Sequence, residues 1–379
     1  MSTPRTRTTG RTAIQCAASE NHPEEDDLLT DIFNAYLEAR KSKRNSSPQV
    51  RFERALSDNI IALYNEISTF RYKVGRCTCF IINDPVKREV FAASFRDRIV
   101  HHLLFNWLSP IFEPTFIYDS YSCRQGKGTL FGIKRLEHHI RSCSDNYKNK
   151  CFVLKLDIEG YFMNINRELL YNIIVCKIES FSRKHSLNFN KKIAIYLLHQ
   201  IIFTDPVRGC YRKGNICQWN GLPRSKSLFY APSGCGLPIG NLTSQLFSNV
   251  YLSKLDDYIK RNLKFAHYGR YVDDFFIVSN SKEELLQSIP KIRSFLMERL
   301  GLSLHPRKVY LAPIEYGVKF LGVVIKPNGR YLSRSCKIRM KRHICNLLTD
   351  EENPYIISAT IESYRGYLSH IHSSLSFDG

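Results

Sequence analysis

The fold of this chain is decided by the stretch Tyr268-Gly269-Arg270-Tyr271-Val272-Asp273-Asp274-Phe275-Phe276-Ile277-Val278. Two adjacent carboxylates lie between apolar segments rich in β-favouring residues, a pattern that predicts a hairpin with the acids at its tip. At a tight turn both side chains can reach one site, and two like charges held together there require a cation between them. The pattern therefore indicates a divalent-metal site, with a solvated turn or a helix cap as the alternative.

A third acid, Asp157, ends the apolar segment Cys151-Phe152-Val153-Leu154-Lys155-Leu156-Asp157. This segment predicts a buried strand, where a lone carboxylate is costly unless it binds a cation. Adjacent strands of one sheet could bring Asp157 beside Asp273. Two Mg²⁺ ions held there would activate an attacking 3′-hydroxyl and stabilise a leaving pyrophosphate. In the alternative, Asp157 caps the helix that follows.

The charge balance predicts a polyanionic partner. The 379 residues include 55 Lys and Arg against 35 Asp and Glu, a formal charge of +20, whereas the hydrophobic content of 43% is ordinary. Nucleic acid is the first choice and an anionic membrane surface the second. No apolar run approaches the roughly 20 residues that span a bilayer, and the first residues lack the apolar stretch of a signal peptide. We therefore expect a cytoplasmic protein with no membrane partner.

Hydrophobic periodicity predicts an α+β protein. Helices are expected over 28–40, 51–70, 96–112, 167–178, 191–203, 242–264, 282–300 and, last and strongly basic, 335–348. Strands are expected over 151–157, around the Asp273-Asp274 turn, over 308–312 and 318–325, and as a pair within 77–95. This order predicts an antiparallel sheet backed by helices on one face. Residues 204–235 read as an irregular insertion and residues 1–27 as disordered.

Several motifs, taken in order, resemble those of reverse transcriptases. They are the strand acid Asp157, the Tyr-Val-Asp-Asp turn, Gly301-Leu302-Ser303-Leu304-His305-Pro306-Arg307-Lys308 and Phe320-Leu321-Gly322. The resemblance covers about residues 30–345. It implies a right-hand polymerase with fingers at 28–150, a palm at 151–327 that contains the insertion 204–235, and a basic helical thumb at 328–379, all preceded by a tail at 1–27.

The resemblance also implies roles for single residues at the acidic site. Asp157, Asp273 and Asp274 match the metal-ligating acids of the family, and two Mg²⁺ ions are the implied cofactors. Lys308 matches the lysine that protonates pyrophosphate; a solvated surface lysine is the alternative.

Three further residues match positions that bind the incoming dNTP. Lys87 and Arg88 match the fingers position that grips the triphosphate, a task suited to the bidentate geometry of a guanidinium. Phe162 matches the aromatic steric gate that excludes a 2′-hydroxyl, with ordinary core packing as the alternative.

Nucleic acid is expected at a loop and at the last predicted helix. In the loop Arg124-Gln125-Gly126-Lys127-Gly128, which resembles the family's template-side loop, glycines let the backbone approach a strand. From Tyr316 to Thr349 the chain has eight Lys or Arg and no Asp or Glu. Four of these cations lie on one predicted helix: Lys337, Arg339, Lys341 and Arg342. They suit the backbone of a template–primer duplex, unless they form a solvated charged face.

One segment departs from the common family pattern. Most reverse transcriptases carry Gln before Gly and then Ser-Pro, whereas here Ile239 precedes Gly240 and Gln245 follows Ser244. The resemblance implies that Ile239, Gly240 and Gln245 contact the incoming dNTP and its template partner. This variant is similar to the reverse transcriptases of diversity-generating retroelements. Ile239 cannot form the hydrogen bonds of an amide, and losing one orienting contact reduces discrimination by about 1 kcal/mol, roughly tenfold. We therefore expect low fidelity, which the family implies at template adenines; ordinary packing of Ile239 is the alternative.

The leading interpretation is an RNA-directed DNA polymerase that copies a template-repeat RNA with errors for mutagenic retrohoming. A reverse transcriptase of bacterial antiphage defence is the alternative enzyme, and a non-catalytic nucleic-acid-binding module with a degenerate palm is the alternative outside that class. The resemblance implies dNTPs, a structured template RNA, its RNA/DNA duplex and a small basic accessory protein as partners, in a bacterial or phage-encoded setting. The helix 28–40 and the insertion 204–235 are the candidate interfaces for the accessory protein.

Overall fold

The computed structural model describes residues 23–41, 46–84, 86–349 and 353–371. The first helix, α1, spans Pro23–Lys41 and so begins inside the predicted disordered tail. That prediction is wrong for its last residues, and the rest of the tail lies outside the described residues. No helix in the described ranges is both long and apolar enough to cross a membrane.

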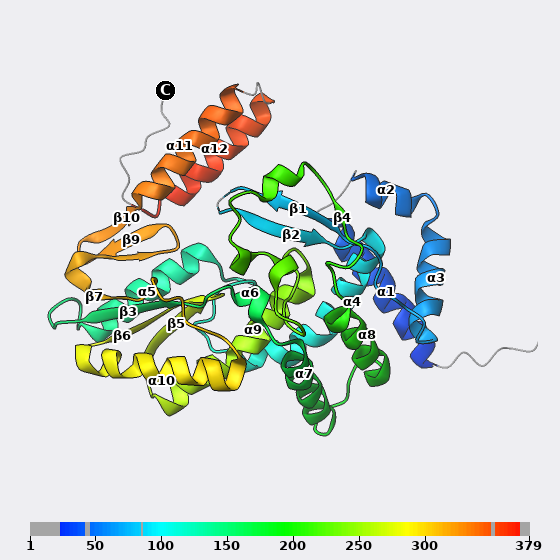
Figure 1. Cartoon of the computed structure of the whole chain (residues 1–379), viewed down its shortest axis with the longest axis horizontal. Coiled ribbons are helices and arrows are strands. Elements are labelled where there is room, and N and C mark those ends of the chain that lie inside the picture. Colours follow the sequence, from blue (N-terminus) through cyan, green and yellow to red (C-terminus); the bar gives the residue numbers. More distant parts are fainter. Residues whose placement is uncertain (1–22, 42–45, 85, 350–352, 372–379) are drawn as a thin grey trace, which may run out of the picture.

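A four-stranded antiparallel sheet carries the acids (Figure 1). Its order is β5-β6-β3-β7, with bounds His267–Tyr271, Asp274–Ser279, Phe152–Asp157 and Tyr310–Pro313. Strands β5 and β6 form the predicted hairpin, and β3 pairs with β6 in a register that sets Asp157 opposite Asp274. The predicted antiparallel sheet is therefore confirmed, and the register brings together acids that lie far apart in the sequence.

Both faces of this sheet are covered, so the prediction of helices on one face is wrong. One face packs on α4 (Phe95–Phe112), α9 (Leu242–Asp257) and α10 (Lys282–Leu300). The other face packs on α5 (Thr129–Cys143) and on a small C-terminal sheet within residues 318–332. The reason is that β6 is apolar on both faces, because Phe275 and Ile277 point one way and Phe276 and Val278 the other.

The remaining helices lie in the N-terminal part and after β3, and the N-terminal part also holds a separate sheet built on β1 and β2. Helices α2 (Ser47–Glu53) and α3 (Leu56–Ser68) replace the single helix expected over 51–70. Strands β1 (Thr78–Ile82) and β2 (Arg88–Ala92) pair as predicted. Downstream lie α6 (Tyr161–Asn164), α7 (Arg167–Ser182) and α8 (Lys191–Phe203). Helix α9 ends before the predicted residue 264 and continues as a π-helical turn, Tyr258–Asn262.

The predicted insertion 204–235 is mostly irregular, with three 3₁₀ turns and one short strand. That strand, β4 (Tyr211–Arg212), pairs in parallel with β1. The insertion is therefore joined to the N-terminal sheet, although in sequence it lies within the predicted palm.

The C-terminal part differs from the prediction in two ways. The strand expected over 318–325 turns back on itself, giving β8 (Val318–Phe320) and β9 (Val323–Lys326), which pairs with β10 (Gly329–Leu332). The predicted boundary at residue 327 falls inside this last hairpin. Helix α11 (Arg334–Thr349) is followed by α12 (Pro354–Leu368), so 335–348 is not the last helix. The two helices project together beyond the sheets (Figure 1).

Candidate active site

The three carboxylates meet at one end of the four-stranded sheet. Asp157 ends β3, Asp274 begins β6 directly opposite, and Asp273 lies in the β5–β6 turn. The ammonium of Lys308 lies 2.9 Å from both carboxylate oxygens of Asp157. That of Lys155 lies 3.2 Å from Oδ1 of Asp274. Asp157 and Asp274, which lie opposite each other on β3 and β6, are thus each paired with a lysine.

Burial sets the electrostatics of the turn. Burial and, after it, the nearby Asp157 carboxylate together raise the pKa of Asp273 from 3.8 to about 6. Burial also raises the pKa of Asp274, whereas Lys155 opposes that rise. Two half-buried carboxylates beside a third acid therefore form a site that favours any added positive charge.

The donor set fits divalent cations. All the donors are carboxylate oxygens, the ligands that Mg²⁺ prefers. Oδ1 of Asp274 is buried, and although Lys155 lies close, this oxygen accepts no hydrogen bond from the described residues. Within the described ranges no group of His, Cys, Asp and Glu side chains is already drawn together as a ligand cage. The acids would therefore turn from their lysines to hold metal.

The turn itself is held by a buried arginine that sequence reasoning missed. Arg270 is fully buried and donates to both carboxylate oxygens of Asp256, at 2.8 and 2.7 Å. Its third nitrogen donates to the carbonyl of Val272, at 3.1 Å, next to Asp273. Val272 has φ of 55°, an uncommon backbone conformation for a β-branched residue. The sequence signal that could have pointed to Arg270 was a charged residue within a segment otherwise typical of a buried strand.

The positions expected around the nucleotide are joined by backbone contacts. Leu237 N donates to the carbonyl of Phe162 at 2.8 Å, and Phe91 N donates to the carbonyl of Ile239 at 2.8 Å. The side chains of Phe162 and Ile239, both half-buried, pack on one small apolar cluster: Cys79, Phe91, Met163 and Leu228. Gln245 is exposed on α9. The structure thus brings Phe162 and Ile239 together and leaves Gln245 open to solvent.

Gly240 allows this segment to approach β2. Its φ is 122°, and a Cβ there would lie 2.8 Å from Cγ1 of Val90 and 3.1 Å from the carbonyl oxygen of Phe91. No other residue type fits without a shift of the strand.

Lys87 and Arg88 lie at the tip of the β1–β2 hairpin. Arg88 is exposed, and Lys87 donates to the carbonyl of Asn220 in the insertion at 2.6 Å. Neither has a contact with the three acids. A role at the triphosphate therefore depends on the hairpin lying over a bound nucleotide.

The residues expected to bind nucleic acid lie in the loop 124–128 and on α11, and the loop residues are largely held by contacts within the protein. The side chain of Arg124 is 7% exposed and its guanidinium donates to Glu113 and to the carbonyls of Ile117 and Ser120, so it has a structural role in place of the expected strand contact. Lys127 donates to the carbonyl of Tyr118 and lies over that ring. The backbone around Gly126 is open.

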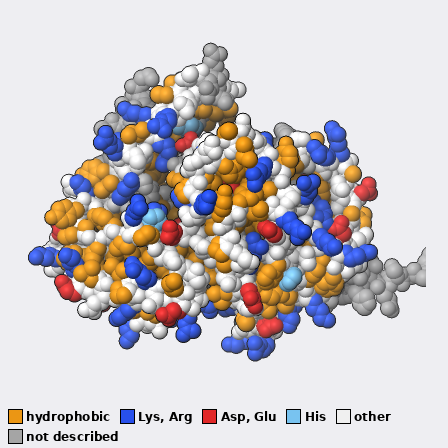
Figure 2. Space-filling view, in the orientation of Figure 1, with side chains coloured by type: hydrophobic (Ala, Val, Ile, Leu, Met, Phe, Trp, Pro, Cys, Tyr) orange, Lys and Arg blue, Asp and Glu red, His pale blue; other side chains and the backbone are white. Residues whose placement is uncertain are grey.

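On α11 the expected cations differ in exposure. Lys341 and Arg342 are exposed, whereas Lys337 and Arg339 are half-buried. Figure 2 shows more Lys and Arg than Asp and Glu side chains on the face drawn.

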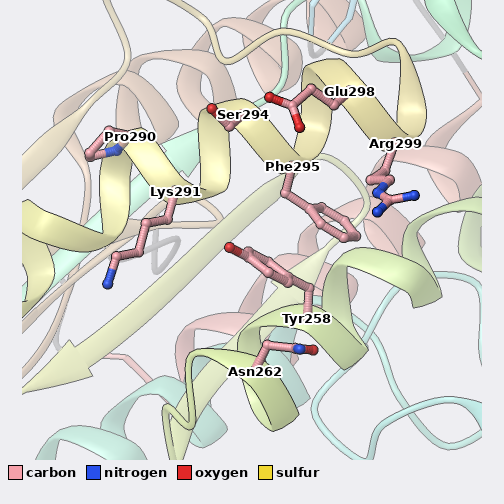
Figure 3. Close-up of a pocket in the computed structure, with 8 residues that line it drawn as sticks. All are labelled: Tyr258, Asn262, Pro290, Lys291, Ser294, Phe295, Glu298 and Arg299. Carbon is pink, nitrogen blue, oxygen red and sulfur yellow. The ribbon is translucent and has the colours of Figure 1, made fainter.

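A groove of about 700 Å³ lies apart from the acids, between α10 and the π-helical turn. The rings of Tyr258 and Phe295 stack there 4.1 Å apart, and Lys291 and Arg299 line its rim (Figure 3). None of the predicted site residues lines it.

By sequence, this chain matches one family model and resembles two known proteins. The family model described as reverse transcriptase (RNA-dependent DNA polymerase) matches residues 87–325. A putative COX1/OXI3 intron 2 protein of Saccharomyces cerevisiae is 21% identical over 63% of this chain and 30% of its own length. Protein YkfC of Escherichia coli is 23% identical over 64% of this chain and 65% of its own length. The chain thus spans less than two thirds of either relative.

Solved structures similar to the chain include telomerases. A Candida albicans telomerase with a fragment of telomeric RNA aligns with a TM-score of 0.48 and 10% identity, over 85% of this chain and 61% of that one. An apo telomerase of Candida tropicalis aligns with a TM-score of 0.47 and 14% identity, over 71% and 59%. The family match includes all three acids and the sheet that carries them. The chain therefore belongs to the reverse transcriptase family and has the α+β fold of a right-hand polymerase.

Proposed function

We propose that this protein is an RNA-directed DNA polymerase. The observation that supports this most directly is the register that sets Asp157 against Asp274, with Asp273 at the adjoining turn. Each of these two facing acids is paired with a lysine. The site therefore needs positive charge, and bound cations would supply it as well. A non-catalytic binding module would have no need for three acids at this cost.

The roles of the residues follow from their places. Two Mg²⁺ ions would supply activation of a 3′-hydroxyl and stabilisation of pyrophosphate when bound. Asp157, Asp273 and Asp274 would hold them, and the β3–β6 pairing fixes the spacing of the carboxylates. Lys308, once released from Asp157, would provide the proton that the leaving pyrophosphate takes up.

The surrounding parts bind and orient the substrates. In this proposal Lys87 and Arg88 bind the triphosphate, and Phe162 excludes a 2′-hydroxyl. Residues 28–150 serve as fingers, 151–327 as palm and 328–379 as thumb, where the exposed Lys341 and Arg342 lie against the duplex.

The finer proposal is error-prone copying of a template-repeat RNA for mutagenic retrohoming. It is supported by Ile239, which lies beside Phe162 and presents no amide to a base pair. A structured template RNA, dNTPs and a small basic accessory protein are the proposed partners, in a bacterial or phage-encoded cytoplasmic setting. Service in bacterial antiphage defence is the second candidate, because the same polymerase site would support it.

The decisive experiment is template-dependent DNA synthesis by Asp273→Asn, which preserves side-chain shape and removes the charge. We expect at least a thousandfold loss of synthesis because a metal ligand is lost. The matched control is Asp257→Asn, an exposed acid paired with Arg261 on the surface, which should keep full activity. Equal synthesis by Asp273→Asn and the unaltered protein would refute the polymerase proposal.

A further inference from the structure

The insertion 204–235 is docked rigidly on the N-terminal sheet. Glu89 of β2 is 1% exposed, and its carboxylate accepts hydrogen bonds from three groups of the insertion. They are Trp219 Nε1 at 2.8 Å, Ser227 Oγ at 3.0 Å and Leu228 N at 2.7 Å. Charge-assisted hydrogen bonds to a buried carboxylate are strong and directional, so the insertion is presented as a fixed surface.

This surface borders the acidic site. A Cβ on Gly160, which follows closely after Asp157, would lie 2.6 Å from the carbonyl oxygen of Ser225. Cys235, at the end of the insertion, forms a β-bridge with Asn166. In Figure 1 the green loops of the insertion lie between the β1–β2 hairpin and α6. A strand bound there would be held beside the three acids.

The exposed side chains of the insertion are basic and aromatic. Five exposed cations stand against the single acid Asp205: Arg208, Arg212, Lys213, Arg224 and Lys226. None of the five forms an ion pair with another described residue. Tyr211 and Tyr230 are 65% and 61% exposed. Figure 2 shows Lys and Arg side chains beside apolar ones over this part of the molecule.

We propose that residues 204–235 bind single-stranded RNA, as the template strand approaching the acids; this rests on the proposed polymerase function. Unpaired cations supply contacts for phosphates. Exposed rings supply platforms for bases, and only unpaired bases can stack on them. Arg224 lies over the Tyr230 ring at 5.2 Å, so one phosphate-binding group and one stacking group already stand together. A duplex would offer its phosphates but not its base faces.

The test uses binding without catalysis, so that it is independent of the polymerase proposal. A short fluorescent single-stranded RNA is titrated with the full chain in EDTA, without dNTPs, at several salt concentrations. The charge variant is Lys213→Gln, Arg224→Gln and Lys226→Gln together, and the stacking variant is Tyr211→Ala with Tyr230→Ala. All five side chains are exposed, and circular dichroism checks that both variants fold.

The two variants should fail differently. The charge variant should bind at least tenfold more weakly, with a log–log salt slope smaller by about 2, since each lost phosphate contact on a single strand removes about 0.7. The stacking variant should lose about five- to a hundredfold per stacked base with its salt slope unchanged.

The matched control removes equal charge elsewhere. Lys291→Gln, Arg293→Gln and Arg299→Gln take three exposed cations from α10, two of them at the groove of Figure 3. This variant should bind the RNA as the unaltered protein does. Unchanged affinity of the charge variant would overturn the inference, and so would an equal loss by the α10 variant.

Two other outcomes would assign the surface to a different partner. Equal weakening on an RNA/DNA duplex and on single-stranded RNA would make it a product contact. Full RNA binding by both variants, with loss of an accessory protein in co-purification, would make it a protein interface. Either result overturns the inference while leaving the polymerase proposal intact, because Asp273→Asn tests that separately.

Discussion

The β5–β6 turn and the segment 236–241, which the proposed function assigns to one site, are held by different forces. The turn is fixed within its own sheet by the buried pair of Arg270 and Asp256. The segment is fixed to β2 of the other sheet, through the carbonyl of Ile239 and the side chain of Asn241, which accepts from Ala93 N at 3.3 Å. In the proposed function, chemistry would therefore depend on a buried charge network, and base-pair selection on backbone contacts and apolar packing.

Under the proposed function, this difference means that base-pair selection could change while the acids stay in place. A substitution at Ile239 alters a half-buried side chain on a small cluster that includes Phe91 and Met163. A substitution at Arg270 leaves a buried carboxylate without its partner. The first costs little stability and the second a great deal.

The largest effect is expected from Arg270→Met. It leaves Asp256 buried without its cationic partner, with only the Tyr268 hydroxyl still donating to it, which should lower the free energy of unfolding by about 3–5 kcal/mol and abolish synthesis through loss of the turn. Urea denaturation measures the first and primer extension the second. The control is Arg261→Met, which breaks the exposed pair with Asp257 and should cost less than about 1 kcal/mol. Similar losses for both variants would show that the network does not hold the turn.

Asp273→Asn should stabilise the metal-free protein at pH 7.5. The folded pKa of Asp273, about 6, lies above its ordinary 3.8, so the folded state binds the proton more tightly than the unfolded state. Stability therefore falls as pH rises from about 4 to about 6 and stays low above, by on the order of 2 kcal/mol. Asp273→Asn has no ionisable carboxyl at this position, so its stability should not fall over this pH range.

Urea denaturation in EDTA checks this at pH 7.5 and at pH 4. The advantage of Asp273→Asn should be present at the higher pH and nearly absent at the lower. The control Asp145→Asn changes an exposed carboxylate and should shift stability by less than about 0.5 kcal/mol at either pH. An advantage that persists at pH 4 would contradict the electrostatic explanation.

Gly240→Ala should push the segment 236–241 away from β2 without changing the acids. The added Cβ meets β2, and the backbone conformation is strained, so we expect a loss of about 1–3 kcal/mol. Gly366→Ala is the control, because that glycine lies in α12 with open space around it, and the change should stabilise by about 0.5–1 kcal/mol. If Gly240→Ala unfolds at the same urea concentration as the unaltered chain, β2 does not fix the segment.

The smallest effect is expected from Ile239→Gln. Restoring an amide should reduce misincorporation at template adenines by about tenfold, or about 1.4 kcal/mol, with little change in stability. Sequencing the cDNA measures it, and Ile239→Leu, which adds no hydrogen-bonding group, is the control. An unchanged error spectrum in the Gln variant would favour ordinary packing as the role of Ile239.

Local pattern was sufficient where one segment decides its own structure. The apolar, β-favouring segments around Asp273-Asp274 and before Asp157 predicted β5, β6 and β3, and the helical periodicity of 282–300 predicted α10. It failed where the outcome depends on a distant partner. Helix α12 was missed; among its described residues no side chain is buried in the core, and the helix is placed by its contact with α11.

The sequence by itself determined the acids, their turn and the family, because these are local patterns in a fixed order. Only the tertiary structure decided that Arg270 is buried on Asp256, that Arg124 is committed to Glu113, and that the insertion is anchored by Glu89. The physical reason is that a charge is tolerated in the interior only when a particular distant partner is brought to it. Such pairs depend on packing, which no local periodicity encodes.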